Sequence, residues 1–210
     1  PKQLLMGVVA VAAVVVVMVV ALVTGAIQVD WLSNIVTAVA LVAAIYLWAQ
    51  MYTSKLVTRE EKNRLLGFIP MFVSGVLFFG IFQQQFTVMT IYSDVRLDRH
   101  MFGWEIPPSL VQSINPIFIV IFSAVFATMW TKLGDRQWST PVKFGAANIV
   151  IGISLFFFLP FSGGEANSTP MYAIIFILFL FTMAELLLSP VGNALATKVA
   201  PVAFPSRMMA

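Results

Sequence analysis

The sequence predicts an all-α integral membrane protein with six transmembrane helices. Of its 210 residues, 60% are hydrophobic and only 10% are charged, whereas about a quarter of the residues of a soluble domain are charged. Six runs with little or no charge follow one another, each long enough to cross a hydrocarbon core, which needs about 20 helical residues. Backbone hydrogen bonds must be satisfied inside lipid, and the alternation typical of a membrane barrel is absent, so the runs are predicted to be helices.

The first run is longer than the apolar core of a signal peptide and is therefore predicted to be a spanning helix. The chain opens on Pro1 rather than on Met, which suggests a piece of a longer protein. The predicted spans are 4–26, 31–53, 65–92, 107–131, 144–161 and 171–198.

Lysine and arginine placement predicts the orientation. If the chain starts inside, the outer segments hold only Arg96 and Arg99 among 12 basic residues. This bias places both ends on the cytoplasmic side of a cell membrane, inner or plasma, with the lipid bilayer as surroundings. Because the basic residues lie in short segments between apolar runs, no nucleic-acid partner is expected. The inner basic residues are Lys2, Lys55, Arg59, Lys62, Arg64, Lys132, Arg136, Lys143, Lys198 and Arg207.

Polar residues divide the chain into two parts. The first two runs consist largely of Val, Ala, Leu and Ile, which predicts a lipid-facing transmembrane hairpin over 1–54. Residues 55–64 are charged and form a predicted cytoplasmic linker. The four later runs, within 65–210, contain glutamines, an Asn-Pro pair, interior prolines and one glutamate. Such residues are tolerated at membrane depth where they line a cavity, so this part is predicted to hold the site.

Glu185 is the only ionisable side chain inside any long apolar run. A carboxylate at that depth costs a few kcal/mol and marks an ion or substrate path by default. Ser189 follows four residues later and shares the same helix face.

Three consecutive glutamines, Gln83 to Gln85, lie within run 65–92 and are expected close to mid-membrane. Successive helical residues point about 100° apart, so at most two can face one cavity and the third is expected to bond a neighbouring helix. Their amides serve either as bonds between helices or as groups for a polar solute. The phenylalanines at 78, 79 and 82 are expected to pack, although Phe79 also suits a side-chain pocket.

Asn115 precedes Pro116 in run 107–131. Pro116 cannot donate to the carbonyl of Gln112, which predicts a bend. The amide of Asn115 either reaches a solute or caps the disrupted turn.

Four blocks resemble successive signatures of the proton-coupled oligopeptide transporters, a branch of the major facilitator superfamily. They are FFGIFQQ at 78–84, QSINPIF at 112–118, STPVKFG at 139–145 and ELLLSPVG at 185–192. The resemblance implies a secondary active transporter that imports di- and tripeptides with protons by alternating access. It also implies that 1–54 is the hairpin inserted between the two halves, and that the other four helices are core helices seven to ten, a partial C-terminal bundle. The remainder of the transporter would then be a required partner.

The resemblance also implies roles for five residues. Glu185 corresponds to a cavity glutamate that pairs with a lysine or the peptide amino end and changes protonation, whereas Asn115 and Ser189 lie near that amino end. Phe79 stands where many members have a tryptophan that lines a side-chain pocket. Gln83 stands where many have an acidic residue, and an amide cannot titrate. Glu185 is therefore the candidate for proton coupling.

No pattern for catalysis or metal binding is present: the chain has no cysteine, and its single histidine, His100, falls in a predicted outer loop. We therefore expect no enzyme and no cofactor, with protons as the coupling ion. The alternative function is a non-transporting accessory or interaction subunit of a larger membrane complex.

Overall fold

The computed structural model describes residues 16–17, 20–21, 24–25, 29–101, 103–205 and 208. The chain divides into two units, Pro1–Leu56 and Val57–Ala210. The first unit contains α2 (Val29–Thr53), which matches the predicted span 31–53. The predicted span 4–26 lies almost wholly outside the described residues. Within the described part, five helices are long and apolar enough to cross a membrane, where six were predicted for the whole chain.

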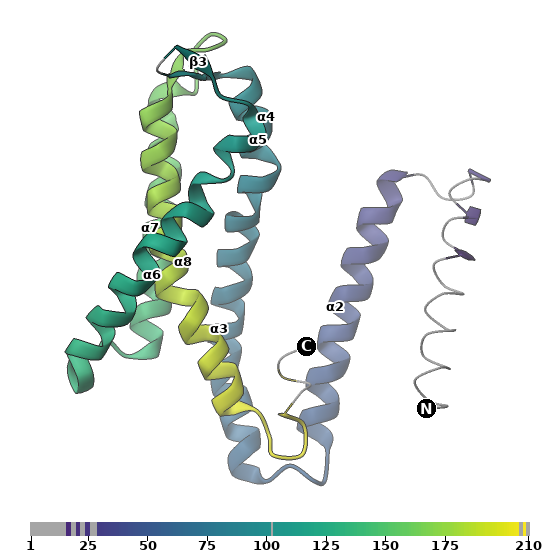
Figure 1. Cartoon of the computed structure of the whole chain (residues 1–210). Coiled ribbons are helices and arrows are strands. Elements are labelled where there is room, and N and C mark those ends of the chain that lie inside the picture. The colour runs from purple at the N-terminus through teal and green to yellow at the C-terminus, as the bar shows by residue number, and fades with distance from the viewer. Residues whose placement is uncertain are drawn as a thin grey trace. The chain divides into compact units, whose positions relative to one another are not determined.

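The second unit is built from four long helical segments (Figure 1). Short strands and turns join them, and the all-α class is confirmed. In chain order the elements are α3 (Arg59–Phe82), η1 (Gln83–Phe86), α4 (Val88–Val95), β1 (Leu97–Asp98), β2 (His100–Met101), β3 (Trp104–Glu105), α5 (Pro108–Val111), α6 (Ile114–Leu133), η2 (Gly134–Arg136), α7 (Thr140–Phe156), η3 (Leu159–Phe161), β4 (Thr169–Pro170) and α8 (Met171–Val199).

The start of α3 shortens the predicted linker 55–64, because the helix already begins at Arg59. Thr58 and Glu61 form a capping box: the Glu61 N–H donates to Thr58 Oγ1 at 3.3 Å, and the Thr58 N–H donates to Glu61 Oε2 at 2.8 Å. This exchange satisfies donors that a helix start leaves without partners. The backbone N–H of Val202 also donates to Glu61 Oε1 at 2.9 Å, which ties the segment after α8 to the start of α3.

Two of the predicted helices are interrupted. Run 65–92 changes at η1 into a 3-10 turn before α4 continues. Run 107–131 is broken between α5 and α6, before Pro116 rather than at it. The break includes Gln112, the residue whose carbonyl Pro116 cannot bond, so the predicted bend is confirmed. Pro116 occupies the first turn of α6, where a backbone N–H would have no partner inside the helix, so the proline removes no hydrogen bond there.

The helix α8 forms the centre of the second unit. Of its most apolar 18-residue stretch, 61% is buried. Ile174 and Ile177 are fully buried, and Phe181 is 2% exposed. The ring of Phe181 lies 6.1 Å from that of Phe82 on α3, and Phe82 stacks on Phe78 at 5.7 Å. Apolar packing thus joins α3 to α8 just before the candidate residues Gln83 and Glu185 in the chain.

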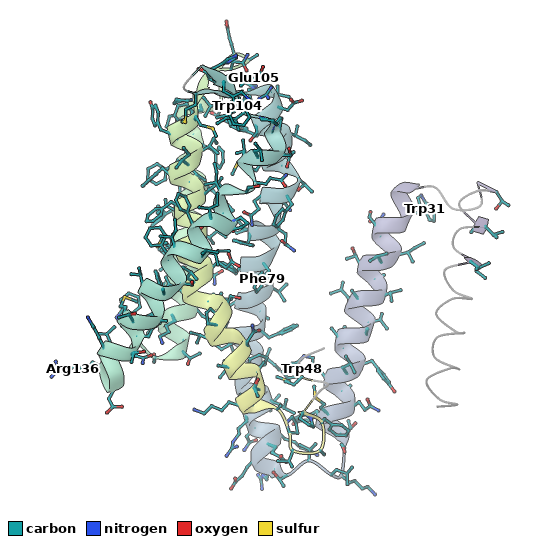
Figure 2. The ribbon with its side chains drawn as sticks, viewed as in Figure 1. Trp31, Trp48, Phe79, Trp104, Glu105 and Arg136 are labelled. Carbon is teal, nitrogen blue, oxygen red and sulfur yellow. The ribbon has the colours of Figure 1, made fainter. Side chains whose placement is uncertain are left out.

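The loops at the end of the unit that carries β1 to β4 are held together by two small ladders. β1 pairs with β4 in parallel, β2 pairs with β3 in antiparallel fashion, and the Tyr92 hydroxyl shares a hydrogen bond of 2.6 Å with Thr169 Oγ1. Arg99 forms an ion pair of 2.9 Å with Glu105 and lies 3.8 Å from Asp94. Figure 2 shows Trp104 and Glu105 at this end of the unit and Arg136 at the opposite end.

Candidate functional site

The site is organised on one face of α8. Glu185 is the middle residue of this 29-residue helix, so about 21 Å of helix lies on each side of it. The side chain is half-buried, and its Oε2 atom is buried without a hydrogen-bond partner. In the part of the chain that the structure describes, no Lys, Arg or His forms an ion pair with Glu185. Spacings of three and four residues place Thr182 and Ser189 on the same face.

Asn115 joins this face from α6. Its side chain is only 3% exposed, and its Nδ2 atom donates to Thr182 Oγ1 at 3.2 Å. The alternative that Asn115 caps the disrupted turn is wrong, because the cap residue of α6 is Ser113, which makes no capping bond with its side chain. The amide instead donates to a residue of α8, as polar side chains of membrane helices commonly bond a neighbouring helix.

A cavity of about 400 Å³ lies between α3 and α8 and brings together two predicted residues, Phe79 and Ser189. Figure 2 shows Phe79 near mid-height of the unit, and its side chain is 40% exposed. A Cβ on Gly75 or on Gly192 would lie 3.9 or 3.4 Å from the ring of Phe144, which is van der Waals contact. All three residues line the cavity, so α7 supplies an aromatic wall through Phe144.

Gln83 is not brought to this cavity. It opens η1 with an exposed side chain. Gln84 bonds within its own segment, to Gly80 O at 3.4 Å and from the Thr87 hydroxyl at 3.3 Å. Gln85 is 2% exposed, and neither polar atom of its amide has a partner among the described residues. Among the described residues, the expected bond from one of these glutamines to a neighbouring helix is therefore not found.

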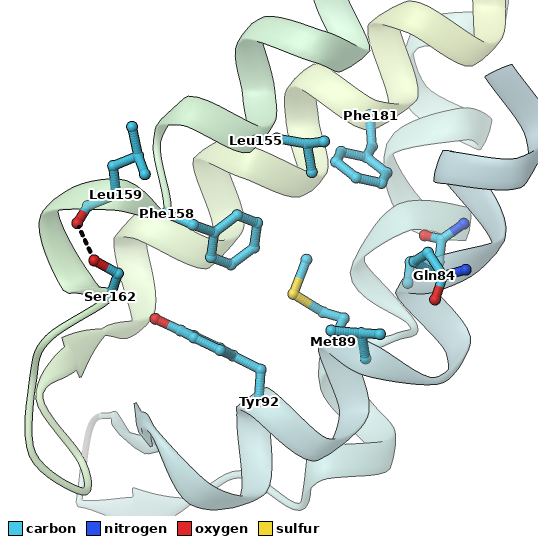
Figure 3. Close-up of a pocket in the computed structure, with 10 residues that line it drawn as sticks. Gln84, Met89, Tyr92, Leu155, Phe158, Leu159, Ser162 and Phe181 are labelled. Carbon is cyan, nitrogen blue, oxygen red and sulfur yellow. Dashed lines mark hydrogen bonds between the residues drawn. The ribbon is translucent and has the colours of Figure 1, made fainter. Parts of the chain in front are cut away.

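A second cavity, of about 250 Å³, lies between α4 and α7. Figure 3 shows Met89, Tyr92, Phe158 and Phe181 around it. Its lining is almost wholly apolar, and the amide atoms of Gln85 are packed away from any accessible surface. This cavity therefore offers packing space and few groups for recognition.

Thr182 is a candidate site residue that sequence reasoning missed. It precedes Glu185 by three residues, and that spacing could have identified it as a neighbour on the same face. Asn193, which lines the larger cavity, was missed as well, although it lies one turn beyond Ser189. The close approach of Phe144 to two glycines has no signal in the spacing of one helix, because it depends on how three helices pack.

Comparisons with known proteins give relatives of this chain. A family model described as PTR2, the POT family, matches residues 3–210. An uncharacterized transporter of Bacillus subtilis (strain 168), YclF, is 37% identical over 188 residues, which cover 89% of this chain and 38% of that protein. The di-/tripeptide transporter of Lactococcus lactis subsp. cremoris is 40% identical over 185 residues, covering 84% of this chain and 37% of that protein.

Solved structures of peptide transporters are similar to this chain as well. The crystal structure of a peptide transporter POT in complex with sulfate matches with a TM-score of 0.87 and 34% sequence identity, covering 99% of this chain and 43% of that one. The chain thus spans well under half the length of the relatives it matches. Since the family model matches nearly its whole length, the chain belongs to the POT family.

Proposed function

We propose that the chain is part of a secondary active transporter of the cell membrane that imports di- and tripeptides together with protons by alternating access. The observation that carries the proposal is the carboxyl group of Glu185 at the midpoint of α8, with a buried oxygen that no described residue bonds. Such a group is costly in a membrane unless it meets a cation, a proton or a water-filled cavity. A peptide ammonium group or a coupled proton would each neutralise the carboxylate and so lower this cost.

The arrangement around Glu185 fits the amino end of a peptide. Asn115 reaches the same face of α8 through Thr182, and Ser189 lies one turn beyond Glu185. We assign the peptide ammonium group to this face. The cavity beside Ser189, lined by Phe79 and Asn193, then receives a peptide side chain. Phenylalanine at position 79 leaves more room there than tryptophan would.

Gln83 has an exposed amide that can bond a solute but cannot carry a proton. Glu185 is the sole ionisable group that the polar face of α8 presents, so we assign proton coupling to it. A carboxyl that binds a peptide ammonium group in one state and a proton in another links the two equilibria, because each ligand shifts the population of states that the other binds.

The remainder of the transporter is needed for this function. Alternating access requires two bundles that rock around a shared site near the midplane, and this chain contributes part of one. We place both of its ends in the cytoplasm. In support, Arg99, one of only two basic residues in the predicted outer segments, forms an ion pair with Glu105 and lies close to Asp94. Its positive charge is therefore already neutralised by acidic neighbours.

Uptake by the full-length protein in proteoliposomes tests the proposal. With an inward proton gradient we expect a labelled dipeptide to accumulate, and a protonophore to abolish the accumulation. Free amino acids and protein-free liposomes serve as controls. A folded, monodisperse protein that takes up no di- or tripeptide would refute the peptide assignment. A natural polypeptide of only 210 residues that co-purifies with other membrane subunits would favour the accessory role instead.

A further inference from the structure

We propose that Thr182 is a positioning residue, which turns the amide of Asn115 so that its oxygen faces the peptide ammonium group. Thr182 is fully buried, and Asn115 is 3% exposed. Their hydrogen bond joins α6 to α8, three residues before Glu185. The inference rests on the proposed function, since it concerns how the same site recognises the amino end of its substrate.

The direction of the hydrogen bond between Asn115 and Thr182 follows from the number of protons that the threonine hydroxyl can donate. A hydroxyl has one proton to donate and two lone pairs to accept with. Thr182 Oγ1 donates its proton to the carbonyl of Leu178, one turn earlier, at 2.9 Å. Only its lone pairs remain for Asn115. The group that Asn115 turns toward Thr182 must therefore be the Nδ2 donor, which lies 3.2 Å away.

This orientation leaves the other end of the amide for recognition. Among the described residues, no group donates to Asn115 Oδ1, and this oxygen is not sealed from the surface as the amide atoms of Gln85 are. An amide oxygen accepts from an ammonium group but cannot donate to it. If the amide were reversed, its NH₂ group would meet the ammonium donor to donor. Thr182 thereby favours a free amino end over an end that has been acylated.

Variants of Thr182 in the full-length transporter test the inference. Thr182→Val keeps the shape and removes the hydroxyl, so the amide is free to turn. We expect the KM for a dipeptide to rise on the order of tenfold, as for loss of a hydrogen bond to a charged group, while the maximal rate changes little. The preference for the dipeptide over its N-acetylated form is expected to fall by a similar factor. Thr182→Ser keeps the hydroxyl and is expected to restore both values.

The matched control is Ser154→Ala. Ser154 is also fully buried and donates to a carbonyl of its own helix, Ile151 O, but no side-chain amide of the described residues donates to its hydroxyl. This variant is expected to leave KM and the N-acetyl preference unchanged. If Thr182→Val does not fold, Thr182→Ala removes the same hydroxyl with a smaller side chain.

A double variant separates positioning from general stability. If Thr182 acts through the amide, Thr182→Val combined with Asn115→Ala is expected to raise KM no further than Asn115→Ala alone. Additive effects, or a Thr182→Val protein with wild-type KM and wild-type N-acetyl preference, would overturn the inference while leaving peptide transport intact. A wild-type protein that transports no peptide would instead overturn the proposed function.

Discussion

The helices α6 and α8 are both long and apolar enough to cross a membrane, yet they differ sharply in burial. In the segment Pro108–Arg136, which contains α6, 11% of the most apolar 18-residue stretch is buried, whereas the value for α8 is 61%. On α6, Val120 is 75% exposed, while Ile177 of α8 is fully buried. Apolar composition therefore identifies a membrane span but does not tell which span lies at the centre of the bundle.

Beyond Asn115, whose bond to Thr182 joins the two helices, the polar residues of α6 differ from those of α8 as well. On α6, Ser123, Thr128 and Thr131 all donate to carbonyls of their own helix at 3.2, 2.8 and 2.8 Å. On α8, Thr182 accepts from another helix, and Glu185 has a buried oxygen without a partner. Polar groups that bond within their own helix are compatible with a surface in lipid. Groups that need a partner outside their helix indicate an interior or a cavity.

The largest expected effect on stability concerns the buried core. Phe181→Ala removes a ring that packs on Phe82 and is expected to lower the free energy of unfolding by about 3 kcal/mol. Val120→Ala on α6 is expected to change it by less than about 0.5 kcal/mol. Equilibrium unfolding of the full-length protein in mixed micelles measures both. A large loss of stability from Val120→Ala would contradict the contrast between α6 and α8, because it would mean that another part of the transporter covers α6.

A smaller effect is expected where Gly192 meets Phe144. A Cβ at Gly192 already lies 3.4 Å from the ring, so Gly192→Val is expected to overpack the contact and cost about 2 kcal/mol. Gly145→Val is the control, since a Cβ at the exposed Gly145 meets no atom within 4 Å. Unfolding in the same micelles gives both values, and equal costs would show that the approach of Phe144 is not tight.

The smallest expected effect concerns a bond between helices. Asn148 on α7 donates to Ser74 Oγ on α3 at 2.8 Å. Asn148→Ala is expected to cost about 1 kcal/mol, within the range of single polar contacts between membrane helices. Thr128→Val removes a hydroxyl that bonds only its own helix and is expected to cost less than about 0.5 kcal/mol. If the two variants lose the same stability, the distinction between self-satisfied and partnered polar groups fails.

Much of the fold could be predicted from the sequence, because lipid forces long apolar runs to be helices. The predicted span 171–198 agrees with α8 (Met171–Val199) to within a residue at each end. The helix α7 begins at Thr140 rather than at the predicted 144, with Ser139 directly before it and a proline in its first turn. These are local signals that the apolar run alone does not include.

The interruption at η1 could not be predicted in the same way. It contains neither Gly nor Pro, only Gln83 to Gln85 and Phe86, so no residue there breaks a helix by itself. The sequence also predicted candidate residues that the structure brings together: Phe79 and Ser189 line one cavity, and Asn115 reaches the face that carries Glu185. The partner of Asn115 could not be foreseen, because a hydrogen bond between residues 67 positions apart depends on the packing of α6 on α8.

The central claim is that Glu185 couples peptide movement to protons, and Glu185→Gln in the full-length transporter tests it most directly. The amide keeps the shape of the side chain but cannot titrate. We expect this variant to exchange peptide across a proteoliposome membrane in the absence of a gradient, yet to accumulate none when an inward proton gradient is imposed. Glu105→Gln makes the same chemical change in the ion pair with Arg99 and is expected to accumulate peptide normally. Wild-type accumulation by Glu185→Gln would contradict the account.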